Sequence, residues 1–405
     1  MRFAGIDVGS QTHVVAIVDE TGQVVLRPAS FGEDLSGYQR LFELLGPPAD
    51  ILVALEATGH YSRNLFAALA QRSYPVALVN PLRTRRFAQE ELMRAKTDSI
   101  DALGIARFAA QKRPPVSKLA DQPTAELREI IGLHDRFLQD FQDRVRQLHR
   151  LVHLCFPEFT RYVRQLRSQR ATAVLRKYPT AAAFDCSAVR GLVGLREAGL
   201  LRSMPERLAQ DLVKAASISV GQHRGRAYSK HVEYVCQDID ELRARLASLE
   251  EEIDQRVAEH EVASLLTTIA GMGALSAARI VAAVGDPARF RHAGAFAAYV
   301  GAVPGTNRSG LRRPGHSSLC PLGNARLRRA LYMTTLAVIR HNPWLGTYYH
   351  RLHQSGKLPK IAILAAMRKL LTAVYSVAKH RRPFVPRLNA SPSSPSNELT
   401  SPNST

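Results

Sequence analysis

Four carboxylates in the first quarter of the chain are spaced as ligands for metal ions. Asp7 and Glu56 each close a short apolar run, and Asp98 and Asp101 stand three residues apart in a helical pattern. Residues three apart share one face of a helix. Acids from two strand ends and one helix face supply the hard oxygen ligands that a pair of Mg²⁺ ions takes. This set predicts a site that cuts or rejoins phosphodiester bonds.

Each of these acids also has a purely structural explanation. Asp7 suits a strand-to-turn transition beside glycines, and Glu56 suits a solvated strand end. Asp98 could cap a helix, with Asp101 in its first turn, where acids are favoured. Taken singly, these explanations are the simpler ones. They do not explain why acids fall at strand ends that meet in one sheet, so the metal hypothesis rests on the set.

Two groups of basic residues could hold a phosphate chain beside these acids. The first precedes the acidic pair and comprises Arg83, Arg85, Arg86 and Lys96. The second lies in and after a Gly/Pro-punctuated segment and comprises Arg308, Arg312, Arg313, Arg326, Arg328 and Arg329. Either group could instead be a solvated basic face.

Ser309 follows Arg308 directly in the second group. A serine hydroxyl among arginines can attack a phosphodiester while the guanidinium groups stabilise the developing charge. From the spacing alone, an ordinary turn serine is the simpler interpretation.

Composition points to a polyanionic partner. The 405 residues carry a formal net charge of +20, with a pI of about 10.3. Nucleic acid is the simplest partner for such a chain, although a ribosome-like basic protein fits too. The four cysteines form no C-x-x-C pair, which argues against a zinc knuckle or redox motif and predicts free thiols in a reducing cytosol. We expect neither a signal peptide nor a membrane span.

The order of elements predicts an α/β domain over residues 1–118. Apolar runs predict strands at 3–8, 14–18, 24–26, 51–56 and 76–80, with helices at 35–45, 60–72 and on to about 110. Three strands followed by alternating helices and strands is the order of a ribonuclease-H-like sheet.

Residues 119–262 carry two long heptad patterns, at 124–156 and 232–253. They could be two helices packed on each other in one chain. Because heptads of this length are unusual in globular helices, we expect a coiled coil that joins protomers. A small helical insert at about 158–230 separates them, with no readable function.

A mostly helical domain is expected over 263–384. Residues 265–280 look like a helix-hairpin-helix element whose Gly271 and Gly273 turn could bind a phosphate, or could be a plain tight turn. Residues 385–405 are rich in Ser, Pro and Asn, which predicts a disordered tail.

Four motifs resemble the DEDD-type transposases of bacterial insertion sequences, the IS110 family. They are Gly5–Ser10, Leu55–Gly59, Lys96–Ala102 and Pro304–Tyr332. The resemblance covers residues 1–115 and 262–384, and it implies an N-terminal domain similar to the RuvC Holliday-junction resolvase.

The resemblance implies roles for particular residues and partners. Asp7, Glu56, Asp98 and Asp101 would bind Mg²⁺, and Ser309 would form a covalent link to DNA. Ser317 and Ser318 lie nearby and compete for that role. Donor and target DNA, and a non-coding guide RNA that pairs with both, would be the partners. The protein would be cytoplasmic and nucleoid-associated, and a dimer or tetramer.

Other functions stay open on the sequence. A RuvC-like resolvase or nuclease would use water in place of serine. A sugar-kinase-like or actin-like ATPase shares the Gly5–Ser10 pattern, but the Asp98 and Asp101 pair and the basic C-terminus argue against it. A non-catalytic coiled-coil protein that binds nucleic acid is the fourth alternative.

Overall fold

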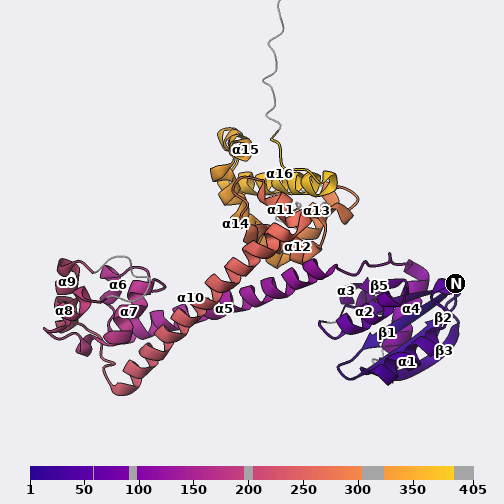
Figure 1. Ribbon diagram of the computed structural model, residues 1–405, viewed down its shortest axis with the longest axis horizontal. Coiled ribbons are helices and arrows are strands. Elements are labelled where there is room, and N and C mark those ends of the chain that lie inside the picture. Colours follow the sequence, from indigo (N-terminus) through magenta and orange to yellow (C-terminus); the bar gives the residue numbers. More distant parts are fainter. Residues whose placement is uncertain (58, 91–97, 196–203, 303–322, 387–405) are drawn as a thin grey trace, which may run out of the picture. The chain divides into compact units, whose positions relative to one another are not determined.

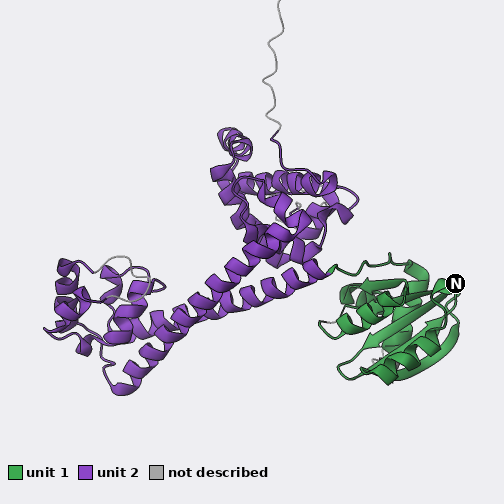
Figure 2. Ribbon diagram, in the orientation of Figure 1, with its two compact units in different colours: residues 1–121 green, residues 122–405 purple. Residues whose placement is uncertain are grey.

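The chain folds as two compact units, which Figure 2 shows in separate colours. The computed structural model describes residues 1–57, 59–90, 98–195, 204–302 and 323–386. One unit spans Met1–Asp121 and the other Gln122–Thr405.

The N-terminal unit is built on a five-stranded sheet in the order β3-β2-β1-β4-β5 (Figure 1). The strands are β1 Arg2–Val8, β2 Thr12–Val18, β3 Val24–Gly32, β4 Ile51–Glu56 and β5 Val76–Val79. The first three are antiparallel, while β4 lies parallel to β1 and to β5. This mixed sheet confirms the predicted ribonuclease-H-like fold class.

One strand is longer than the sequence pattern predicts. β3 continues to Gly32, whereas the apolar run suggested an end at Leu26. The strand is an edge strand with mostly exposed side chains, and Pro28 lies within it. Edge strands tolerate proline and polar residues, which removes the apolar signal that prediction relies on.

Helices cover both faces of the sheet. They are α1 Leu35–Leu45, the short η1 Pro48–Asp50, α2 Ser62–Gln71, α3 Pro81–Glu90 and α4 Asp98–Lys112. Side chains alternate along a strand. On β1, Ile6 and Val8 therefore pack with α1 and α2 on one face, while Phe3 packs with α3 and α4 on the other.

Two long antiparallel helices, α5 Gln122–Cys155 and α10 Arg226–Glu259, form the centre of the C-terminal unit (Figure 1). Polar pairs fix their direction, because partners early in α5 meet partners late in α10. These pairs are Glu126 with Arg256, Arg144 with Asp238, and Gln147 with His231.

The heptad positions of the two helices face each other within one chain. Leu127, Ile131, Ile239 and Leu242 are among those that this packing buries. Packing within the chain, the alternative to our expectation, therefore accounts for the pattern without a second copy. Association of protomers through these helices stays a prediction.

The insert between the long helices is helical. It contains α6 Phe159–Tyr162, α7 Gln169–Lys177, η2 Ala181–Ala183, α8 Ala188–Val193 and α9 Glu206–Ser217. Its core includes side chains from α5 and α10. Cys155, Cys186 and Cys236 are free thiols, and Cys320 lies outside the described residues.

The rest of the C-terminal unit packs around α16. The elements are α11 Glu261–Thr267, α12 Ala274–Val284, η3 Pro287–Arg289, α13 Ala293–Val300, α14 Ala325–His341, α15 Pro343–Gln354 and α16 Pro359–His380. Within the described ranges, α16 alone is long and apolar enough to cross a membrane, and most of its apolar stretch is buried in this unit.

The turn between α11 and α12 lies where the helix-hairpin-helix pattern predicted one. Gly271 has a φ of +89°, and a Cβ there would lie 2.8 Å from the Cα of Val338 in α14. The turn is therefore packed against a helix at this glycine. That contact explains the glycine structurally, and phosphate binding by the turn stays a prediction.

Candidate active site

Asp7 and Glu56 end neighbouring parallel strands on one face of the sheet. The register pairs Gly5 with Ala54 and Ile6 with Leu55, so Asp7 and Glu56 are the next residues in line. Both lie an even number of residues from strand side chains that pack against α3 and α4, so both are on that face of the sheet. Because neighbouring strands lie about 4.8 Å apart, the two carboxylates share one small region of this edge.

The helix α4 brings the acidic pair towards the same edge. A Cβ on Gly5 would lie 2.2 Å from the backbone nitrogen of Ala106, so α4 crosses β1 in direct backbone contact. Ala102 packs against Val14, which is the β-bridge partner of Asp7. Asp101, one residue before Ala102, therefore lies over the end of β1 that carries Asp7.

The fourth acid, Asp98, is the first residue of α4. It precedes Asp101 by one helical turn, which places both on one side of that helix. The side chain of Asp98 lies outside the described part of the structure.

The donor set suits a hard divalent cation such as Mg²⁺. It consists of carboxylates from three elements that converge on one edge and one face of the sheet. Among the described side chains, no group of three His, Cys, Asp or Glu is close enough to hold a metal ion. The evidence for a metal site is therefore that the acids share one face and one edge of the sheet. Asp7, Glu56, Asp98 and Asp101 are the residues that would hold the ion.

A partly buried polar cluster supports this edge from the opposite face. Glu33, which follows β3, accepts hydrogen bonds from Tyr38 at 2.7 Å and Asn64 at 3.1 Å, and it bonds the His13 ring at 2.7 Å. Asn64 lies in the first turn of α2, shortly after Glu56. The cluster thus ties β2, β3, α1 and α2 together beside the acids.

The hydrogen bonds decide the charge of Glu33. Burial opposes ionisation, but the hydrogen bonds from Tyr38, Asn64 and His13 outweigh it and lower the pKa of Glu33. Burial and the neighbouring Glu33 carboxylate together raise the pKa of Tyr38. Glu33 therefore acts as an anionic acceptor and Tyr38 as a neutral donor.

Arginines of the first basic group lie on α3, which covers the same face as the acids. Arg83, Arg85 and Arg86 are exposed, and Phe87 between α3 and α4 is buried against Phe108. Asn80 caps the start of α3 by accepting from the Leu82 backbone at 2.8 Å. Cations are thus present on the acid side of the sheet, while Lys96 lies outside the described residues.

The described residues on either side of the segment with the candidate nucleophile are hydrogen-bonded to each other. Ser309, its alternatives Ser317 and Ser318, and the neighbouring Arg308, Arg312 and Arg313 lie outside the described residues. At its two ends, the backbone N–H of Asn324 donates to the carbonyl of Tyr299 at 3.0 Å. This bond holds the start of α14 against the end of α13.

Two family models match the chain. One, a transposase model for DEDD transposases of the IS110 type, matches residues 4–157 and so includes all four acids. The other, described as transposase IS116/IS110/IS902 family, matches residues 263–350 and so includes Ser309. The chain belongs to the IS110 family of DEDD transposases.

Relatives of this transposase span nearly its full length. It is 28% identical to the mini-circle putative transposase for IS117 of Streptomyces coelicolor, over 94% of this chain and 95% of that one. It is 26% identical to the pilin gene-inverting protein of Moraxella bovis, over 83% of this chain and 82% of that one. The solved structure of T. thermophilus RuvC with a Holliday junction substrate matches 28% of this chain and 95% of that one, at 20% identity and a TM-score of 0.22.

The three arginines that open α14 of the transposase have different surroundings. Arg326 and Arg329 are exposed. Arg328 is half-buried and donates to the carbonyl of Val300 at 3.3 Å, which joins α14 to the end of α13. A role in nucleic-acid binding therefore fits Arg326 and Arg329 better than Arg328.

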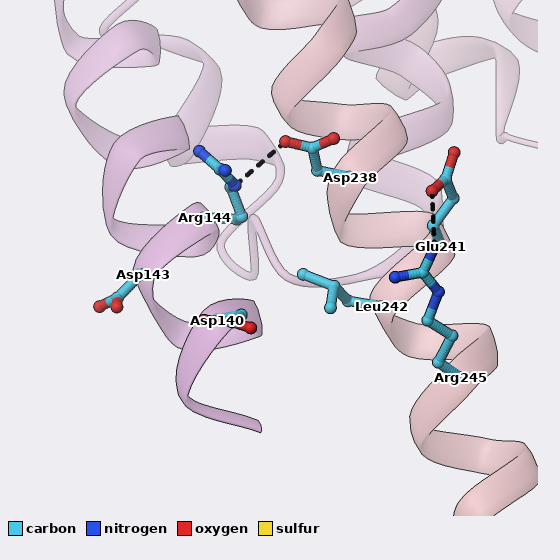
Figure 3. A pocket seen from close by; sticks show the side chains of 7 residues that line it. All are labelled: Asp140, Asp143, Arg144, Asp238, Glu241, Leu242 and Arg245. Carbon is cyan, nitrogen blue, oxygen red and sulfur yellow. Dashed lines mark hydrogen bonds and ion pairs between the residues drawn. The ribbon is translucent and has the colours of Figure 1, made fainter. Parts of the chain in front are cut away.

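A pocket between α5 and α10 does not belong to this site (Figure 3). Arg144 pairs with Asp238 at 3.0 Å, and Arg245 pairs with Glu241 at 3.5 Å. The lining residues are Asp140, Asp143, Arg144, Asp238, Glu241, Leu242 and Arg245. Since ion pairs engage its arginines, we interpret this pocket as part of the helix packing.

Sequence reasoning missed the cluster around Glu33. His13, Glu33 and Asn64 are far apart in the chain and match no spacing rule, so a sequence pattern gave no signal. Only the strand register, which pairs His13 with Val8 beside Asp7, brings them to this edge.

Proposed function

We propose that this transposase cleaves and rejoins DNA with Mg²⁺ held by Asp7, Glu56, Asp98 and Asp101, and with Ser309 as nucleophile. The placement of Asp7 beside Glu56 on the face that α4 covers carries the proposal. Structural roles for single acids do not require that shared face.

The chemistry divides between the two units. Ser309 Oγ would attack the scissile phosphorus and lose its proton, forming a phosphoserine bond as one deoxyribose oxygen leaves. A DNA hydroxyl would then attack the same phosphorus and release the serine. Bound Mg²⁺ would polarise the phosphate and stabilise the developing charge. Arg85 and Arg86 would hold the neighbouring phosphates.

We further infer that a guide RNA selects the DNA. The net charge of +20 can bind more than one polyanion. Base pairing would then read the sequence while the protein holds backbones. The oligomer would place a serine from one protomer at the acids of another, on the nucleoid in the cytoplasm.

Replacement of Glu56 by Gln tests the metal site. We expect Glu56→Gln to lower Mg²⁺-dependent strand cleavage by at least about 100-fold, because a ligand is lost while shape is kept. Nucleic-acid affinity should stay within about twofold in the absence of Mg²⁺, since lysine and arginine side chains hold the phosphates. Gel assays of cleavage and fluorescence anisotropy of binding measure the two quantities.

The matched control is Asp50→Asn. Asp50 is an exposed acid directly before β4, and Glu56 is the last residue of that strand. Asp50 therefore lies at the opposite end of β4 from Glu56. The Asp50→Asn variant should cleave DNA like the wild type. Wild-type cleavage by Glu56→Gln would remove this residue from the metal site.

A further inference from the structure

Five exposed side chains of α14 form a single stripe. They recur three or four residues apart, so at about 100° per residue they fall within an arc of about 80°. In chain order they are Arg326, Arg329, Met333, Leu336 and Arg340. We call these five residues the α14 stripe. Leu327, Leu331 and Val338 on the other side of the helix are buried in the core.

The middle of the α14 stripe is apolar. Met333 is 62% exposed and Leu336 is 36% exposed, less than one helical turn apart. Single exposed apolar side chains are common on proteins. Here two adjacent ones have arginines on both sides along the helix, which is the pattern of a surface that binds phosphates at its ends and apolar groups between them.

The charge around the α14 stripe has one sign. Between Asp286 and Glu398 the sequence holds 18 Lys and Arg and no Asp or Glu. Elsewhere in this unit, arginines meet carboxylates, as Arg279 meets Asp135 at 2.9 Å. Within the described residues, the ion pairs do not include the three arginines of the stripe. A polyanion is therefore the complementary partner.

The stripe starts beside Asn324, which follows the sequence segment that contains Ser309. Asn324, whose backbone bonds Tyr299, also caps α14 by accepting from the Leu327 N–H at 3.0 Å. Arg326 follows two residues later. A strand that lies along the stripe would therefore pass Tyr299 and Asn324, the bonded pair between which Ser309 lies in the sequence.

We propose that the α14 stripe binds the nucleic-acid strand on which this transposase acts. The arginines contact phosphates, and Met333 and Leu336 contact sugars and the apolar edges of bases. From Arg326 to Arg340 the helix rises about 21 Å, the length of about six nucleotides of one strand. The inference rests on the proposed function only in that nucleic acid is the substrate, because binding can be measured apart from cleavage.

The arginines are tested by Arg326→Gln, Arg329→Gln and Arg340→Gln in one full-length protein. The probes are a fluorescein-labelled DNA duplex, its single strand, and RNA of the same sequence. For the DNA probe that the wild type binds more tightly, we expect affinity at about 50 mM salt to fall about 10- to 100-fold, and a loss confined to the RNA probe would overturn the proposal. The slope of log affinity against log salt should fall by about 2 to 3, since about three phosphate contacts are lost.

The matched control removes the same charge elsewhere in this unit. Arg136, Arg146 and Arg245 are exposed arginines of the long helices, each beside a carboxylate. Their triple change to Gln should leave the affinity within about threefold of the wild type. Equal losses in the two triple variants would overturn the proposal, because net charge alone would then explain binding.

The apolar pair is tested by Met333→Ser with Leu336→Ser. Affinity should fall about 3- to 10-fold, because apolar contact is lost, while the salt slope should stay as in the wild type. Light scattering of the same protein tests a protein partner in place of nucleic acid. A smaller oligomer with unchanged affinity would overturn the proposal and make the stripe an interface between protomers.

Cleavage separates this inference from the proposed function. Glu56→Gln should bind with the wild-type salt slope and fail to cleave, whereas the arginine variant should bind weakly and recover cleavage at raised protein concentration. Recovery would support the stripe as a binding surface. Loss of cleavage at saturating protein, with binding unchanged, would overturn it.

Discussion

At the scale of single residues, the face of the strand on which an acid lies decides what it can do. Asp7 and Glu56 could be predicted as a pair from apolar runs that each end in an acid. Their common face followed only from the register between β1 and β4, since a shift by one residue would separate them. Ser309 could be proposed only through family resemblance, because one serine in a turn carries no spacing signal.

Glu33 gives a prediction that depends on pH. Its folded pKa lies below the usual 4.5, so its hydrogen bonds stabilise the fold above about pH 4.5 and lose this effect as pH falls through the lowered pKa. Glu33→Gln should lower the free energy of unfolding at pH 7 by about 1 to 3 kcal/mol. The difference from the wild type should shrink below about pH 4.

Urea denaturation over a pH series measures this difference. The control is Glu43→Gln, on the exposed side of α1, which should change the free energy of unfolding by less than about 0.5 kcal/mol. A deficit for Glu33→Gln that stays constant through acid pH would show that the side chain acts through packing and not through its charge.

At the scale of elements, the apolar runs of the strands and the heptads of the long helices differed in how much structure they predicted. Continuous apolar runs placed β1 and β4 correctly because both strands are buried on both faces. Heptads predicted α5 and α10 as long helices but not their partner, since the same apolar stripe suits a helix of this chain or of another. The backbone contact between β1 and α4 had a signal in Gly5, but its partner Ala106 is about a hundred residues away.

Gly5→Ala tests that contact. A Cβ would lie 2.2 Å from the backbone nitrogen of Ala106 and 2.3 Å from the carbonyl oxygen of Ala102, so α4 would have to move. We expect the free energy of unfolding to fall by about 1 to 3 kcal/mol. Cleavage should fall with it, because α4 carries Asp98 and Asp101.

The matched control is Gly132→Ala in α5, where a Cβ would meet open space. Alanine is the better helix former, so this variant should be more stable by about 0.5 to 1 kcal/mol. Thermal and urea unfolding followed by circular dichroism compare the two. Wild-type stability for Gly5→Ala would contradict the close packing of α4 on β1.

At the scale of the whole molecule, the proposed chemistry is shared between two units. The acids belong to the unit that ends at Asp121, and Ser309 belongs to the unit that follows. Composition predicted a polyanionic partner, but the acid-free stretch around α14 became meaningful only when its exposed side was known. We propose that both units act on one phosphodiester bond.

Trapping of a covalent intermediate tests that claim most directly. On a nicked suicide DNA substrate with Mg²⁺, the wild type should form a protein–DNA adduct that survives denaturation, and mass spectrometry should place the DNA on Ser309. Ser309→Ala and Glu56→Gln should each abolish the adduct. Cleavage by the wild type without an adduct, or an adduct that survives in Ser309→Ala, would contradict the account.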